Sequence, residues 1–268
     1  EIITDPSYKK QIITFTHPHI GNTGINDEDN ESNIIHASGI VVKNYSSKPS
    51  NWRSQTSLED FLIKNEIIGI SDVDTREITT LLREKGAMNC CIASLSVISE
   101  EKAIFAAKNF DGLKGMDLAK IVSTKSEYEW NEGTWPDNKK FDESYSVIAY
   151  DYGVKENILR LLTEYVGKVK VVNAKTPFEE IIKLNPKGIF LSNGPGDPEP
   201  CDYAIESIKK ILQEKIPIFG ICLGHQLLAL AGGASTYKMK FGHHGANHPV
   251  QDLKTMKVAV SSQNHGFT

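Results

Sequence analysis

The chain has 268 residues, a formal net charge of -4 at pH 7 and 40% hydrophobic residues. This length allows two domains of ordinary size, and the composition is that of a soluble globular protein and not of a disordered chain. The acidic balance argues against a nucleic-acid-binding surface, and no apolar run reaches the roughly 20 residues of a membrane-spanning helix.

The four cysteines include the adjacent pair Cys90 and Cys91 and show no Cys-x-x-Cys spacing. The sequence therefore predicts neither a disulfide framework nor a structural zinc site, and a reducing cytoplasm suits it best. The chain starts at Glu1 without Met or an apolar leader, and it stops at Thr268 just after a strand-like segment. We therefore expect both ends to be truncated.

The first 124 residues show short, interrupted apolar patterns. These patterns predict two strands and two helices, at residues 11–15, 39–42, 58–63 and 77–82. The second helix is expected to begin at Asp74 and to end at Gly86. We assign residues 1–124 to a smaller α+β domain and the polar stretch 125–144 to a linker.

From residue 145 onward, apolar strands alternate with helical patterns. The predicted strands are 146–150, 168–172, 188–191 and 217–221, and the predicted helices are 157–166, 178–184, 203–213 and 225–231. This alternation predicts an α/β fold for 145–268, a doubly wound and mostly parallel sheet with helices on both faces. Ligands of such sheets bind beyond the carboxyl ends of the strands, which directs attention to the loops after Leu191 and Ile221.

The loop after Ile221 carries Cys222 between two glycines, Gly220 and Gly224. A Gly-x-nucleophile-x-Gly turn from strand to helix holds its nucleophile on strained backbone, and the glycines leave room for the neighbouring elements. The amino end of the next helix is expected to favour the thiolate, and the N–H of Leu223 to face an oxyanion. We interpret Cys222 as a nucleophile; the alternative is an inert buried thiol.

The loop after Leu191, residues 192–198, is rich in glycine and proline. Its exposed N–H groups can hold an anion or a carbonyl oxygen, although no Gly-Lys-Ser/Thr follows that would make it a phosphate-binding loop. Because both loops leave the same edge of the sheet, Gly194 is predicted to give a second oxyanion donor, with a plain tight turn as the alternative. Cys201 is the rival thiol but lacks flanking glycines, and the pair at 90–91 is predicted to fill the core.

A cysteine nucleophile needs a base, which is usually histidine. His225 lies one helical turn after Cys222 and is expected to pack against its surroundings instead of reaching the sulfur. The histidine-rich segment 240–249 is predicted to be a polar turn and not a metal site, because no cysteine or carboxylate completes a ligand set. His265, after a strand predicted at 257–261, is a candidate base, but the usual chain order places the base beyond a later strand.

Together, the two loops resemble those of the triad class of glutamine amidotransferases. Five further segments resemble the family of small, glutamine-hydrolysing subunits of carbamoyl-phosphate synthetase: residues 5–8, 72–76, 82–86, 115–119 and 240–250. The resemblance covers nearly the whole chain. It implies that residues 1–124 are the amino-terminal domain of that subunit and residues 145–268 its amidotransferase domain.

The resemblance implies that glutamine is hydrolysed to glutamate and ammonia through a thioester on Cys222. It assigns the oxyanion hole to Gly194 and Leu223. It assigns glutamine binding to Gly194, Gly196, Leu223, Gln226, Asn264, Gly266 and Phe267. Ammonia would pass through a channel to a large synthetase subunit, which uses ATP, Mg and bicarbonate to make carbamoyl phosphate for arginine and pyrimidine synthesis. This chain itself would need no cofactor or metal, and the heterodimer is open to higher assembly.

Two elements of the family pattern are expected outside this sequence. The His-Pro-Glu segment that carries the base would follow Thr268, and a glutamine-contacting serine would precede Asp5, before Glu1. Two other functions stay open: a stand-alone thiol hydrolase of γ-glutamyl or peptide substrates, and a scaffold subunit without catalysis. The additional amino-terminal domain argues against the hydrolase, and a thiol on a strained turn argues against the scaffold.

Overall fold

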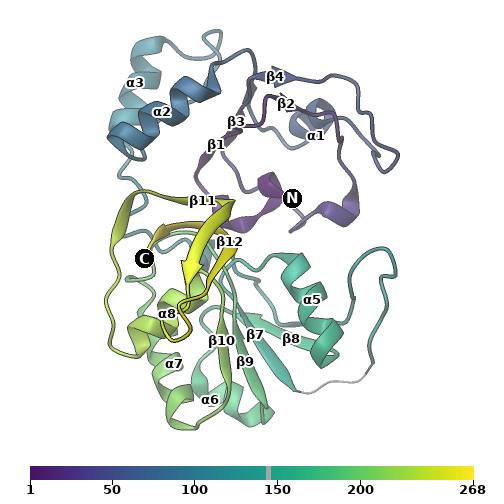
Figure 1. Ribbon diagram of the computed structural model, residues 1–268, viewed down its shortest axis with the longest axis vertical. Helices are drawn as coiled ribbons and strands as arrows, with labels where there is room; N and C mark the ends of the chain where they lie inside the picture. Colours follow the sequence, from purple (N-terminus) through teal and green to yellow (C-terminus); the bar gives the residue numbers. More distant parts are fainter. Residues whose placement is uncertain (143–145) are drawn as a thin grey trace.

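The computed structural model describes residues 1–142 and 146–268, which form two units, one above the other in Figure 1. The end of the predicted linker and the first residue of the predicted second domain, 143–145, lie outside the described residues. Within these ranges, no helix is long and apolar enough to cross a membrane.

The first unit is built on short parallel strands. A three-stranded sheet has the order β1 (Ile12–Thr14), β3 (Gly39–Val41) and β5 (Gly69–Ile70), and β2 (His19–Ile20) pairs with β4 (Asn44–Tyr45). The helices are η1 (Ile2–Thr4), η2 (Pro6–Tyr8), η3 (Asp27–Asp29), α1 (Leu58–Lys64), α2 (Thr75–Lys85), α3 (Glu100–Lys108) and α4 (Ala119–Val122). The four elements predicted in this half are confirmed. Ile3, Ile13, Ile40 and Leu62 are among the residues of its core.

Helix α2 begins and ends where the sequence predicts. The Asp74 carboxylate accepts hydrogen bonds from the N–H groups of Arg76 and Glu77, which otherwise have no partner in the first turn. Gly86 closes the helix with a φ of 96°, a conformation that glycine adopts without steric cost. The next N–H, of Ala87, donates to the carbonyl of Lys240 over 2.9 Å, so the end of α2 is tied to the second unit.

The second unit contains a five-stranded sheet in the order β10-β9-β7-β8-β6. Strands β7 (Val147–Asp151), β8 (Val169–Asn173), β9 (Gly188–Leu191) and β10 (Ile218–Gly220) are parallel, as predicted, and β6 (Tyr128–Trp130) pairs antiparallel to β8. Since β6 lies within 125–144, part of the segment predicted as a linker belongs to this sheet. The domain boundaries stay a prediction.

Helices cover both faces of this sheet. They are α5 (Glu156–Val166), α6 (Phe178–Ile181) with its 3₁₀ continuation η4 (Ile182–Leu184), α7 (Asp202–Gln213) and α8 (Leu223–Ala231). Successive residues of a strand point to opposite faces. Ile148 therefore packs in one cluster with Ile208 of α7 and Leu227 of α8, whereas Ala149 packs with Leu159 of α5. The predicted doubly wound fold is confirmed.

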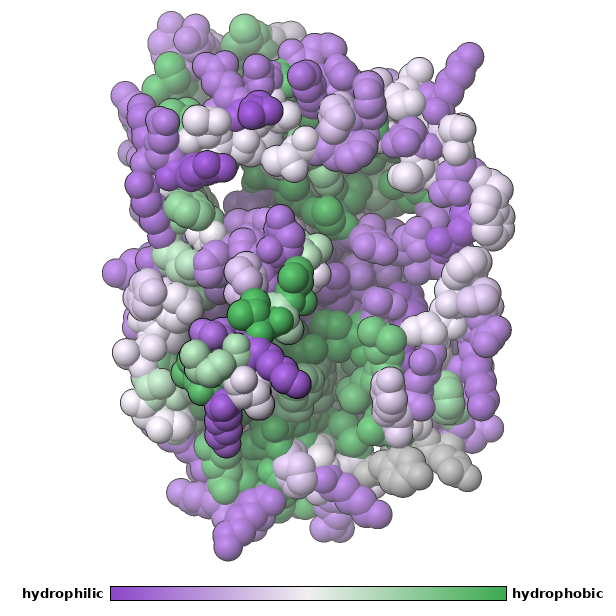
Figure 2. Space-filling view, viewed as in Figure 1, coloured by the Kyte–Doolittle hydropathy of each residue, from purple (hydrophilic) through white to green (hydrophobic). Residues whose placement is uncertain are grey.

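A long hairpin lies between the two units in Figure 1, formed by β11 (Lys238–Gln251) and β12 (Val258–Phe267). The prediction of a polar turn at 240–249 is therefore wrong. The segment forms a strand because β12 pairs with it, and two register shifts absorb its glycine-rich stretch, between Lys238 and His243 and between Gly245 and His248. Figure 2 shows apolar side chains in the lower half of the same face. Phe219 of β10 and Val260 of β12 are among the large apolar residues that are exposed.

Candidate active site

Cys222 lies at the junction of β10 and α8, where the backbone turns sharply from strand to helix. The backbone of Cys222 has a φ of 50° and a ψ of -110°, a conformation that residues other than glycine rarely adopt. Strain of this kind persists only where the surrounding structure holds it. The predicted strand-to-helix turn with the cysteine at its apex is confirmed.

The two glycines beside Cys222 are required by close contacts. A Cβ at Gly224 would lie 2.2 Å from the carbonyl oxygen of Leu191 in the neighbouring strand. A Cβ at Gly220 would lie 2.7 Å from the carbonyl carbon of Gly224 at the start of the helix. Both distances are far below van der Waals contact, so no other residue fits either position without displacing backbone.

The backbone N–H groups of Leu223 and Gly194 both lie near enough to the sulfur of Cys222 to lower the pKa of its thiol. Leu223 supplies the first N–H of α8. Gly194 comes from the loop after β9, and its backbone passes so close to Tyr152 that a Cβ would lie 2.0 Å from that carbonyl oxygen. The fold therefore brings together the two donors that the sequence assigned to an oxyanion hole; their part in catalysis stays a prediction.

The thiol of Cys222 is protonated at neutral pH in this chain. Burial raises its pKa to about 11, against the opposing effect of the Leu223 and Gly194 N–H groups, and Asp5 raises it further. The N–H at the helix end favours the thiolate, as expected, because it lowers the pKa, but removing the charged sulfur from water raises the pKa by more. The thiol donates its hydrogen to the carbonyl of Asn264 over 3.4 Å.

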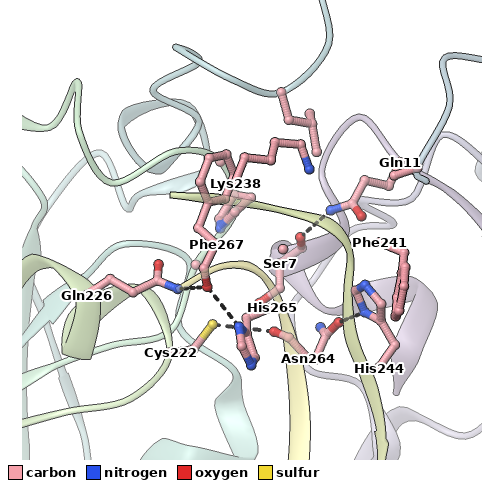
Figure 3. Close-up of a pocket in the computed structure, with 16 residues that line it drawn as sticks. Ser7, Gln11, Cys222, Gln226, Lys238, Phe241, His244, Asn264, His265 and Phe267 are labelled. Carbon is pink, nitrogen blue, oxygen red and sulfur yellow. Dashed lines mark hydrogen bonds between the residues drawn. The ribbon is translucent and has the colours of Figure 1, made fainter. Parts of the chain in front are cut away.

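A cavity of about 90 Å³ opens beside Cys222 and is lined by both units (Figure 3). Of the residues assigned to glutamine, the cavity lining contains Gly194, Gly196, Gln226, Asn264, Gly266 and Phe267. Leu223 is buried and reaches the site through its N–H alone. The structure thus gathers the predicted set around one thiol, and the role of each member stays a prediction.

Hydrogen bonds to one carbonyl hold the end of β12 against this cavity. The Phe267 carbonyl accepts from Nε2 of Gln226 over 2.7 Å and from Nδ1 of His265 over 2.8 Å. The other ring nitrogen of His265 lies 3.2 Å from Nδ1 of His243. His265 therefore lines the cavity with both ring nitrogens engaged in holding the hairpin.

Comparison with known proteins decides the family. The family model described as carbamoyl-phosphate synthase small chain, CPSase domain, matches residues 1–92, and the model of class-I glutamine amidotransferases matches residues 148–268. The carbamoyl phosphate synthase small chain of Pseudomonas putida is 58% identical, over all of this chain and 72% of the relative. That of Vibrio cholerae is 57% identical with the same coverage. This chain belongs to the carbamoyl-phosphate synthase small-chain family.

Membership of the small-chain family confirms the predicted family and enzyme class, and it does not favour a stand-alone hydrolase or a scaffold. Among solved structures, a glutamine amidotransferase of Thermotoga maritima is 25% identical, with a TM-score of 0.31 over 46% of this chain and 60% of the other. The match of residues 148–268 to the amidotransferase model agrees with the parallel sheet and turn described above.

The other thiols of this small chain lie away from the cavity. Cys201 is fully buried, with its sulfur 3.6 Å from Oδ1 of Asp117, and burial raises its pKa to about 12. Cys90 and Cys91 are exposed, so the prediction that they fill the core is wrong. They lie in the irregular segment between α2 and α3, which leaves them open to solvent.

His225 is exposed on α8, so the expectation that it packs against its surroundings is wrong. Its position follows from helix geometry. Leu223, Gly224, Gln226 and Leu227 turn inward, which leaves His225 on the outer face. In the described residues no group of three or more His, Cys, Asp or Glu side chains could hold a metal ion, and this includes the histidines of β11.

Ser7, which was not predicted as a site residue, lines the cavity from η2 of the first unit. Its hydroxyl accepts a hydrogen bond from Nδ2 of Asn193 over 2.9 Å, across 186 positions of sequence. Its carbonyl accepts from Nε2 of Gln11 over 2.9 Å. A glutamine-contacting serine was expected ahead of Asp5, whereas the serine in the cavity follows it. The segment 5–8, which carries part of the family resemblance, contained the signal.

Proposed function

We propose that this chain is the glutaminase subunit of a carbamoyl-phosphate synthase, with Cys222 as nucleophile and the N–H groups of Gly194 and Leu223 as oxyanion hole. The observation that carries the proposal is the proximity of these two N–H groups to one sulfur, inside a cavity lined by the residues assigned to glutamine. Fixed donors at the point where negative charge develops lower the barrier to acyl transfer.

The reaction follows from this geometry. Sγ of Cys222 attacks the side-chain amide carbon of glutamine, and the amide oxygen takes the negative charge between the N–H groups of Gly194 and Leu223. The carbon–nitrogen bond breaks, nitrogen takes a proton and leaves as ammonia, and a γ-glutamyl thioester remains. Water then attacks the thioester, which releases glutamate and returns the proton to sulfur.

A base is required, because a thiol whose pKa is about 11 is about one part in 10⁴ thiolate at neutral pH. The Cys222 hydrogen bond goes to the Asn264 carbonyl and not to a histidine ring. We assign the base to the histidine of the His-Pro-Glu segment that the family resemblance places after Thr268. His265 fits a positioning role better, since its Nδ1 is engaged with the Phe267 carbonyl.

The partner of this chain, in this proposal, is a large synthetase subunit that holds ATP and Mg and receives the ammonia through an internal channel. Its product would be carbamoyl phosphate for arginine and pyrimidine synthesis in the cytoplasm, made by a heterodimer that is open to higher assembly. The support is family membership, because the relatives are named as the small chain of carbamoyl phosphate synthase.

The test uses the full-length small chain assembled with its large subunit. Replacing Cys222 with Ser should lower glutamine-dependent carbamoyl phosphate synthesis by about 10³-fold or more, while synthesis from free ammonia continues. An electrophilic glutamine analogue should modify Cys222 in the parent protein, and Cys91→Ser serves as the control variant at an exposed thiol. Modification confined to Cys201, or full activity without a large subunit, would contradict the proposal.

A further inference from the structure

The loop after β9, which carries one of the two oxyanion donors, has little backbone pairing of its own. Backbone hydrogen bonds tie it at its two ends, Ser192 and Asp197. Between these ends, in the part of the chain that the structure describes, no backbone–backbone hydrogen bond holds residues 193–196. Pro195 has no N–H to donate. Side chains therefore take a large part in fixing the position of Gly194.

One side chain makes three hydrogen bonds at this point. Asn193 directly precedes Gly194 and is only 3% exposed, so its amide needs partners inside the protein. Its Nδ2 donates to the Ser7 hydroxyl over 2.9 Å and to the Gly153 carbonyl over 3.0 Å. Its Oδ1 accepts from the N–H of Lys155 over 3.1 Å. Both hydrogens and the oxygen of the amide are thus engaged.

These three hydrogen bonds fix the loop to both units of the molecule. Ser7 lies in η2 of the first unit, and the other two partners lie in the connection between β7 and α5 of the second. Gly194 belongs to the cavity lining and Asn193 does not. The Asn193 side chain therefore lies behind the cavity wall and acts on the site through the backbone of Gly194.

We propose that Asn193 is a positioning residue that sets the N–H of Gly194 at the point where the amide oxygen of glutamine becomes negative. The proposal rests on the proposed function, because this oxyanion forms only if Cys222 attacks the amide. The N–H of Gly194 and the carbonyl of Asn193 belong to one planar peptide group, so a side chain that fixes Asn193 also directs that N–H. Misplacement of a reacting group by about 1 Å can cost about 100-fold in rate.

The experiment separates stabilisation of the oxyanion from binding of the substrate, in the full-length small chain with its large subunit. The probe is glutamate γ-semialdehyde, the aldehyde analogue of glutamine. Sγ of Cys222 adds to the aldehyde carbon, the carbon–oxygen double bond becomes single, and the oxygen takes the thiol proton. The product is a tetrahedral thiohemiacetal whose oxygen takes the place of the oxyanion, so the Ki of the aldehyde reports on the hole.

Asn193→Ala should lower kcat for glutamine about 10- to 100-fold and raise the Ki of the aldehyde by a similar factor. The KM for glutamine should change by less than about threefold. Neither Ki nor KM depends on the amount of active enzyme, so partial unfolding alone moves neither. If Asn193→Ala does not fold, Asn193→Asp provides the same comparison, because it keeps the shape and the acceptor and loses both donors.

Asn173→Ala is the matched control. Asn173 ends β8, donates to the Thr124 carbonyl over 2.5 Å, accepts from the N–H of Lys175 over 2.8 Å and is absent from the cavity lining. This variant loses hydrogen bonds of the same kind, and its kcat and Ki should stay within about twofold of the parent.

Three results would overturn the proposal: an unchanged Ki of the aldehyde in Asn193→Ala, an equal rise in Ki and KM, or an equal rise in Ki in Asn173→Ala. A parent protein that hydrolyses no glutamine would overturn the proposed function itself, which separates the two failures.

Discussion

One wall of the cavity, made by the β10–α8 turn and the loop after β9, offers backbone N–H groups, whereas the wall made by the hairpin offers side chains together with backbone carbonyls. The first wall depends on glycines that no other residue can replace without displacing backbone. The second depends on polar contacts such as that between Gln226 and the Phe267 carbonyl. Changes in the first wall should therefore damage the fold and the chemistry together, and changes in the second should alter substrate binding first.

The sharpest test of the backbone wall is Gly224→Ala. The new Cβ would meet the Leu191 carbonyl oxygen at 2.2 Å, and forcing an added methyl into packed structure costs about 1–3 kcal/mol or more. We expect a fall of at least about 2 kcal/mol in the free energy of unfolding in urea, with loss of glutaminase activity.

Gly232→Ala, at the other end of α8, is the control. Its backbone has a φ of -78°, and the nearest atom to a new Cβ lies 3.4 Å away. Its stability should stay within about 0.5 kcal/mol of the parent. Equal stability of the two variants would show that the turn accommodates an added methyl group at Gly224 without cost. That result would contradict the contrast drawn between the two walls.

A second test measures how the backbone wall affects the pKa of the Cys222 thiol. Because the pKa of Cys222 is raised to about 11, its alkylation in this chain by a neutral reagent should speed up about tenfold per pH unit between about pH 7 and pH 10. Cys201 should stay unmodified in the native protein because it is fully buried. Peptide mass spectrometry separates the two sites. A rate for Cys222 that is already constant near pH 7 would mean that the helix end outweighs burial.

The smallest effect is expected outside both walls, at His225. This residue follows Cys222 closely in sequence but is exposed on the outer face of α8. His225→Ala should change kcat/KM for glutamine by less than about twofold and the free energy of unfolding by less than about 0.5 kcal/mol. A large loss of kcat would assign it the proton transfer that we place elsewhere.

The backbone wall was predictable because its signals are local. A strand, a glycine on each side of Cys222 and a helix fall within one short stretch, and that order alone specifies the turn. The parallel sheet followed from the alternation of strands and helices, and Asp74 and Gly86 marked the ends of α2 in advance. The pKa of Cys222 did not follow, because burial depends on packing that no short motif records.

The side-chain wall was harder to predict. Gly242, Gly245 and Pro249 are typical of turns, and only the pairing with β12 makes that segment a strand. The position of Ser7 depends on the contact between η2 and the loop after β9, which joins residues far apart in sequence. Tertiary contacts of this kind override local preference, and a single sequence carries little trace of them.

The hydrogen bond between Ser7 and Asn193 ties η2 of the first unit to the loop that carries Gly194. A protein engineer who transplants the amidotransferase portion onto another synthetase would have to carry this remote serine along with it. Natural selection faces the same constraint, so gene fusions and domain exchanges in this lineage should preserve the two portions as a pair.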